Sequence, residues 1–229
     1  MGMTGLIIAS LAFMLIHAAP ASGIRAWLVA RIGERGYLAA FSVLSLALLV
    51  WMARAYGAAL PAAPLWIAGL PLRVVIAVLT LVPFWLVVAA NTERNPAAVG
   101  GGAILEKSAA PRGVFTVTRH PLMVGIAGWA ALHLFANADF PSLILFASLI
   151  ATALVGAWLQ DRRKEREIGV AWRRYLAQTS FMPFGAIRQG RTRLDTSDVT
   201  WWRIAIALGL WLIFLIGHGE IFGVPALAL

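Results

Sequence analysis

The sequence predicts an all-α fold, a polytopic membrane helix bundle with about six transmembrane helices and a cytoplasmic amphipathic helix. Three observations support this prediction. The 229-residue chain is 61% hydrophobic and 13% charged, whereas a soluble domain carries about 25% charged residues. Six apolar runs are long enough, or nearly long enough, to cross a bilayer. The basic residues gather in alternate segments between these runs, as they do in membrane proteins of defined orientation.

The first three predicted spans are residues 3–22, 37–56 and 72–90. The first contains His17 and lacks the cationic segment that begins a cleavable signal sequence, so we expect it to be retained as a helix. A turn rich in proline and alanine, residues 61–71, precedes the third span.

The other three predicted spans are residues 121–136, 141–160 and 204–222. Pro121 suits the first position of a helix, where a missing N–H has no cost. The fourth span is short against the roughly 20 residues that a bilayer requires. Together the six spans predict a single integral membrane domain that covers residues 1–229.

Two segments between the spans are long. Residues 91–117 contain Asn95-Pro96 and three consecutive glycines, so they predict a turn-rich loop. Residues 161–203 predict a cytoplasmic segment that continues from the fifth span as an interfacial amphipathic helix. Its apolar face would consist of Ile168, Trp172, Tyr175 and Leu176.

The distribution of charge predicts the orientation. Seventeen of the nineteen lysines and arginines fall in the segments after the first, third and fifth spans, and only Arg54 and Arg73 fall on the other side. Basic segments stay in the cytoplasm. We therefore expect a multi-pass protein of the bacterial inner membrane, with cytoplasmic basic loops and both termini in the periplasm.

The composition also limits the chemistry and the partners. The chain has no cysteine, which excludes disulfides, thiolate nucleophiles and thiolate-bound metal. The chain has a net charge of +9, and basic cytoplasmic loops are the ordinary source of such a charge in a membrane protein. We therefore expect the lipid bilayer as the partner, together with a hydrophobic small-molecule substrate, and no nucleic acid.

Three of the four histidines, His17, His133 and His218, lie within predicted spans. An ionisable residue inside the membrane is a functional hypothesis by default. One interpretation is that these imidazoles bond nearby carbonyls and tie helices together. The other is that they are axial ligands of haem, which imidazole suits in a helix bundle. Idealised depth matches His133 with His218 better than with His17, but spacing alone does not select the pair.

His120 lies 13 residues before His133, about 20 Å away along a helix. One straight helix therefore cannot offer both to the same metal ion. At the predicted membrane edge, Arg119 and His120 have two interpretations of their own. With residues 165–175 they would cradle an anionic cofactor, or they would form a solvated surface that binds lipid head groups.

Several short motifs occur in order along nearly the whole chain. They are Leu15-Ile16-His17, Gly33-Glu34-Arg35-Gly36-Tyr37, Asn95-Pro96, Thr118-Arg119-His120-Pro121, Leu132-His133, Thr179-Ser180-Phe181-Met182-Pro183-Phe184 and His218. On these motifs the chain resembles the NnrU family of bacterial membrane proteins and, through it, the zeta-carotene isomerases of plants and cyanobacteria.

The resemblance implies a haem b protein that isomerises a cis double bond of a carotene. It implies that His133 and His17 are the iron ligands, and that His120 and His218 match further histidines. Another histidine expected after the second span is absent, because Arg54 and its neighbours stand there. The family name implies a link to denitrification.

A more distant resemblance concerns the second half of the chain. Arg119-His120-Pro121, followed by Glu167, Gly169, Trp172 and Tyr175, is similar to the cofactor-binding region of isoprenylcysteine and phospholipid methyltransferases. That resemblance implies S-adenosylmethionine as the cofactor, although a second acidic contact to it is missing here.

Three functional hypotheses follow. The leading one is a haem-binding protein of the NnrU type, a redox-dependent isomerase of a hydrophobic polyene such as a cis-carotene. The second is a membrane methyltransferase that uses S-adenosylmethionine. The third is a non-enzymatic assembly or regulatory factor of respiration.

Overall fold

The computed structural model describes residues 2–60, 62–97, 105, 110–197 and 199–227, and all the regular structure within these ranges is helical. The all-α prediction is confirmed. The elements are α1 (Gly2–Ala18), η1 (Ala19–Ala21), α2 (Gly23–Ala59), α3 (Leu70–Leu79), α4 (Leu81–Thr92), α6 (Val114–Val117), α7 (Pro121–Ala136), α8 (Phe140–Ile168), α9 (Val170–Gln178), α10 (Gly185–Arg188), α11 (Trp201–Ile216) and α12 (His218–Phe222).

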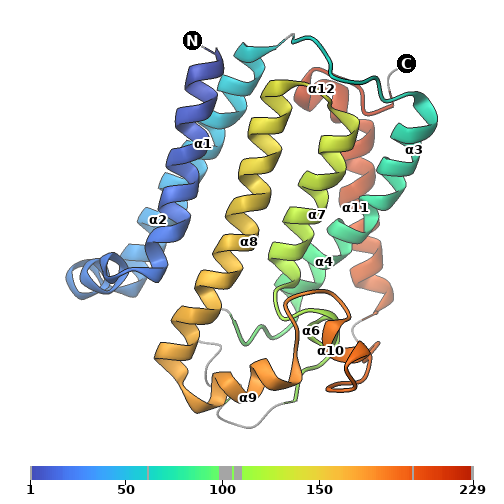
Figure 1. The fold of residues 1–229 in the computed structure, drawn as a ribbon. Coiled ribbons are helices and arrows are strands. Elements are labelled where there is room, and N and C mark those ends of the chain that lie inside the picture. The colour runs from blue at the N-terminus through green and yellow to red at the C-terminus, as the bar shows by residue number, and fades with distance from the viewer. Residues whose placement is uncertain (1, 61, 98–104, 106–109, 198, 228–229) are drawn as a thin grey trace.

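The long helices form a bundle with α8 near its middle (Figure 1). Helix α8 packs against α1 and α7, α7 packs against α4, and α4 packs against α11. Both chain termini lie at one end of the bundle, which we call the terminal end and which also holds α12. The opposite end holds α6, α9 and α10, and we call it the basic end.

The apolar helices identify a multi-pass membrane protein. Four helical stretches among the described residues are long and apolar enough to cross a membrane, namely Gly2–Ala21, Gly23–Ala59, Leu70–Thr92 and Phe140–Ile168. Helices α7 and α11 are apolar but have only 16 residues each. Each of these six stretches overlaps one of the six apolar runs of the sequence, so the helix count is roughly as predicted.

Two predicted spans differ in detail from the helices that form. Helix α2 begins at Gly23 and bends at Gly33, whose φ of 73° lies in the left-handed region that glycine tolerates. Its first turn is capped by the hydroxyl of Ser22. The third span lies across α3 and α4, which meet at Thr80. Pro83 has no N–H for the carbonyl one turn before it, which accounts for the break.

Helix α8 continues beyond the predicted span as a charged segment and ends at Gly169, where φ is 64°. Helix α9 follows at an angle across the basic end (Figure 1). Its apolar face does not point to lipid: Trp172 and Tyr175 are buried against Ala97 and Leu105. The loop of residues 91–117 therefore covers α9, at least through these two described residues.

Candidate functional site

The three histidines of the predicted spans each direct Nδ1 at a backbone carbonyl, four residues earlier for His17 and His133 and six residues later for His218. The Nδ1 atom of His17 lies 2.8 Å from the carbonyl oxygen of Phe13, and that of His133 lies 2.9 Å from the carbonyl oxygen of Trp129. His218 makes the same kind of bond to the carbonyl of Val224. A carbonyl only accepts, so Nδ1 carries the proton and Nε2 of the neutral ring keeps its lone pair. Each histidine is therefore oriented as a potential Nε2 ligand.

Aromatic rings hold the imidazoles in place. The ring of His133 lies 4.3 Å from that of Trp129 and 5.2 Å from that of Phe146, between centroids. His17 lies in the same way between Phe13 and Phe41, at 4.1 Å and 5.3 Å. These contacts give each ring an apolar setting from which bulk water is largely displaced.

The structure brings His133 and His218 to the same end of the bundle. Helix α12 and the last turn of α7 both lie at the terminal end (Figure 1), and His218 acts electrostatically on His133. His17 lies at the end of α1, next to η1. Just beyond it, the carbonyl of Ala21 accepts a bond from Arg166 in the charged part of α8. His17 and His133 therefore stand toward opposite ends.

The side chains available for metal binding are few. Among the residues that the structure describes, no group of three or more histidine, aspartate or glutamate side chains could hold a metal ion. A shallow pocket of about 440 Å³ opens beside α12, and neither His133 nor His218 lines it.

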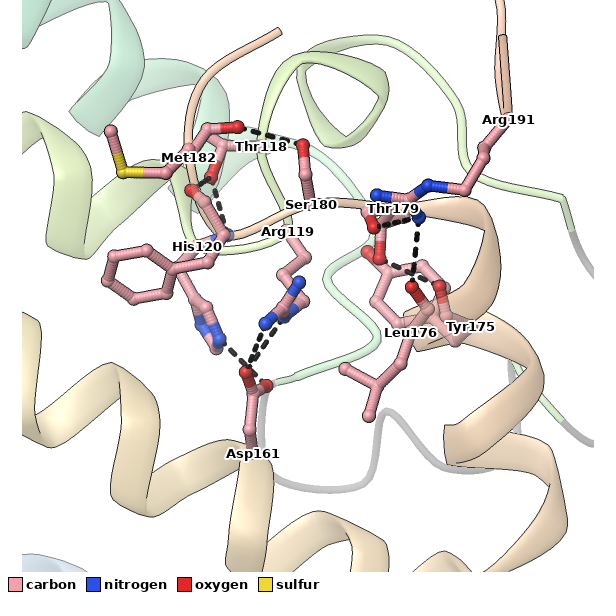
Figure 2. A network of polar contacts seen from close by, with 11 residues as sticks. Thr118, Arg119, His120, Asp161, Tyr175, Leu176, Thr179, Ser180, Met182 and Arg191 are labelled. Atoms are coloured by element: carbon pink, nitrogen blue, oxygen red, sulfur yellow. Dashed lines mark hydrogen bonds and ion pairs between the residues drawn. The ribbon is translucent and has the colours of Figure 1, made fainter. Parts of the chain in front are cut away.

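His120 and Arg119 belong to a different site, at the basic end. His120 Nε2 lies 2.8 Å from Oδ1 of Asp161, and Arg119 Nε and Nη2 lie 2.8 Å and 2.7 Å from Oδ2. Figure 2 shows the carboxylate of Asp161 where both side chains converge. Asp161 does not stand out in the sequence, because it begins a run of charged residues that resembles a solvated helix end. The signal that could have found it is its place one residue beyond an apolar span.

Backbone contacts hold this cluster in position. The hydroxyl of Thr118 donates to the carbonyl of Phe181 at 2.8 Å, and the Arg119 N–H donates to the carbonyl of Ser180 at 3.0 Å. The Thr118 hydroxyl also accepts the His120 N–H at 3.3 Å. The motif before α7 is thus fixed to the segment after α9, and these are two of the motifs that the sequence analysis singled out.

In this cluster the negative charge of Asp161 is paired with the guanidinium of Arg119 and bonded by the imidazole of His120. Burial alone would raise the pKa of Asp161, but the hydrogen bonds from His120 and then Arg119 outweigh it and hold the pKa below its usual value. The guanidinium of Arg119 is therefore already engaged, which leaves it fewer donors for an anionic cofactor than the sequence alone suggested.

Tyr175 lies near this cluster and packs on Trp172, and each of these two side chains has a polar atom that finds no partner among the described residues. The hydroxyl of Tyr175 and Nε1 of Trp172 are buried and form no hydrogen bond in the described part of the chain. Burial raises the pKa of the Tyr175 hydroxyl, which interacts electrostatically with Arg119 and Asp161. Buried polar groups are nearly always paired, so these two atoms mark a place where an acceptor would fit.

Comparisons with known proteins agree with the resemblance in the sequence. The family model described as NnrU protein matches residues 5–226. The 15-cis-zeta-carotene isomerase, chloroplastic, of Zea mays is 38% identical over 82 residues, which are 36% of this chain and 22% of that protein. The enzyme of the same name from Arabidopsis thaliana is 37% identical over 79 residues, 34% of this chain and 22% of that protein. The matched stretch thus spans about a fifth of these relatives. No solved structure matches.

Proposed function

The chain belongs to the NnrU family, and from this premise we propose that it binds haem in the membrane and isomerises a double bond of a hydrophobic polyene. The similarity to proteins named 15-cis-zeta-carotene isomerase supports a cis-carotene as the substrate class. When bound, haem would supply an iron that changes redox state and interacts with the polyene.

The observation that carries the proposal is the shared arrangement of the histidines. Each Nδ1 bonds a backbone carbonyl, so each Nε2 is free of a proton and oriented. A histidine ligand typically needs its second nitrogen satisfied in this way, because that bond fixes the tautomer and raises the basicity of the ligating nitrogen. The chain supplies no thiolate, so imidazole is its best iron ligand.

We propose His133 as one ligand. The family resemblance implies His17 as the second ligand, but His17 and His133 stand toward opposite ends of the bundle, so the placement of His218 at the same end as His133 favours His218. The aromatic rings around His133 would exclude water from the ligating face, and the Trp129 carbonyl would hold the imidazole orientation. His120, fixed to Asp161, would take no part in ligation.

The proposed setting is the bacterial inner membrane, with the basic end in the cytoplasm and both termini outside it. The uneven distribution of basic residues supports this orientation. A link to denitrification follows from the family name. Growth of a deletion strain on nitrite tests it, because unimpaired growth and unchanged nitrite reduction would overturn it.

One observation favours a second candidate, a methyltransferase that uses S-adenosylmethionine. It is the pair of buried donors Trp172 Nε1 and Tyr175 Oη, which find no acceptor among the described residues, with Tyr175 near Arg119 and Asp161. Calorimetry with S-adenosylmethionine tests it: saturable binding that Tyr175→Phe weakens would support this candidate, and no heat of binding would exclude it.

The absorption spectrum of the purified protein tests the leading proposal. A Soret band, with a haem content that follows the protein through purification, is the expected result. Protein from cells grown with ample haem that shows no such band would overturn the proposal. The histidines would then be left with a role in helix packing.

A further inference from the structure

The motif Gly33-Glu34-Arg35-Gly36-Tyr37 has no part in the proposed function, yet it shapes a corner of the molecule. Helix α2 bends at Gly33. Its first part, residues 23–32, projects sideways from the bundle toward the basic end (Figure 1). The bend places this projecting segment next to the ends of α1 and α8.

The projecting segment has an apolar face. Ile24, Trp27 and Ile32 have exposed fractions of 56%, 54% and 50%. They lie within about 140° of one another around the helix axis, while Ala26 and Ala30 lie opposite. The guanidinium of Arg31 lies 4.2 Å from the ring centroid of Trp27, on the same face. Arg25 stands at the border of this face, about 20° from Ile32, and an apolar face bordered by an arginine is typical of a helix that lies in the membrane interface.

Tyr37 lies one turn beyond the bend, and its hydroxyl has no hydrogen-bond partner within the described part of the chain. The residue is 7% exposed, and its Oη atom is buried and forms no hydrogen bond among the described residues. The guanidinium of Arg25 lies 5.5 Å from the ring centroid. Arg25, Arg163 and Glu34 are its charged neighbours. A buried hydroxyl normally finds a partner, and beside two guanidinium groups the favoured partner is an anionic oxygen.

The corner as a whole is cationic. Arg25 pairs with Glu34 at 2.6 Å and with Glu167 at 3.8 Å, and Arg163 also pairs with Glu167, at 3.5 Å. Two carboxylates therefore face Arg25 and Arg163, and Arg31 and Arg35 add further positive charge on exposed positions. Lys164 interacts electrostatically with the same four side chains, so three cations face two carboxylates and the corner carries a net positive charge.

We propose that this corner binds the phosphate of an anionic phospholipid. The Tyr37 hydroxyl donates to a phosphate oxygen, and Arg25 and Arg163 provide the compensating charge. The acyl chains lie along Ile24, Trp27 and Ile32. A lipid is favoured over free phosphate because the cationic corner and the exposed apolar face are continuous along one helix. This site is independent of haem and lies outside the isomerase proposal.

Native mass spectrometry of the full chain in detergent tests the proposal. We expect the wild-type protein to retain phosphatidylglycerol over phosphatidylcholine with the same acyl chains, and Tyr37→Phe to reduce that preference several-fold. Tyr56→Phe is the matched control, because its hydroxyl bonds Ser142 at 2.9 Å in the terminal half of the bundle. Equal loss in both variants, or no loss in Tyr37→Phe, would overturn the proposal.

Two further arms separate lipid from free phosphate. Inorganic phosphate should not displace phosphatidylglycerol, and displacement at equal concentrations would show a site for phosphate alone. The chain has no cysteine, so a single labelled cysteine reports one position. A polarity-sensitive dye on Ile24→Cys should shift to the blue on transfer to phosphatidylglycerol vesicles, whereas the dye on Ala30→Cys should shift much less. Equal shifts would overturn the interfacial placement.

Discussion

The imidazole of His120 and the carboxylate of Asp161 are 41 residues apart in the chain and 2.8 Å apart in space. His120 precedes the first turn of α7, and Asp161 lies where the apolar part of α8 ends. This contact, reinforced by Arg119, fastens the two helices to each other at the basic end. The same carboxylate thus serves both members of the motif that precedes α7.

The first prediction concerns Asp161→Asn. The substitution removes the charge that Arg119 faces while keeping the shape of the side chain. Breaking one partner of a buried ion pair typically costs about 3–5 kcal/mol, and since Asp161 is slightly exposed we expect the lower part of that range. Thermal unfolding in detergent measures it. Glu165→Gln is the control, because its pair with Arg173 at 3.8 Å is exposed and should change stability by less than about 1 kcal/mol. Equal effects would contradict the role of Asp161.

The second prediction is a pH dependence. The pKa of Asp161 is lower in the folded protein than its ordinary value of 3.8. A depressed carboxyl pKa adds stability that is complete above the ordinary pKa and is lost as the pH falls through the folded pKa. The difference in Tm between wild type and Asp161→Asn should therefore be constant from about pH 5 to 7 and shrink below about pH 4. A difference that grows on acidification would contradict this assignment.

The apolar elements could be predicted from sequence because their signal is local. Length and hydropathy identify a helix such as α8 without knowledge of its neighbours. The bend at Gly33 and the break near Pro83 are harder to predict from sequence, because each depends on the backbone conformation at a single residue inside an apolar helical run. Glycine and proline mark such points but do not fix their geometry.

The candidate site could be predicted only in part, since its contacts are not local. The histidines were visible as ionisable residues in apolar runs, but the partner of His120 was not, because an acid at a helix end usually faces water. Idealised depth matched His133 with His218, and the helices that carry them end at the terminal end of the bundle. The place of Trp172 and Tyr175 under Ala97 and Leu105 could not be predicted, because an apolar helical face fits lipid and protein equally well.

The third prediction concerns orientation. If the basic end faces the cytoplasm, as the charge distribution favours, a reporter that is active only in the cytoplasm should stay silent when fused after the last residue. The same reporter inserted at Arg193, in the polar segment before α11, should be active. An active C-terminal fusion together with a silent insertion at Arg193 would show the opposite orientation and contradict this prediction.

The fourth prediction separates the histidines. We expect His133→Ala to lower the haem-to-protein ratio by about tenfold or more, since loss of even an outer-shell partner costs 10–100-fold in metal affinity. The His120→Ala variant should keep its haem, because His120 bonds Asp161 and is not a proposed iron ligand. Its expected effect is a lower free energy of unfolding. The variants His17→Ala and His218→Ala then identify the second ligand, since only replacement of the true ligand should change the low-spin haem spectrum. Retained haem and an unchanged spectrum in His133→Ala would exclude it as a ligand. Unchanged spectra in both His17→Ala and His218→Ala would leave iron with a single histidine ligand and contradict the bis-imidazole site.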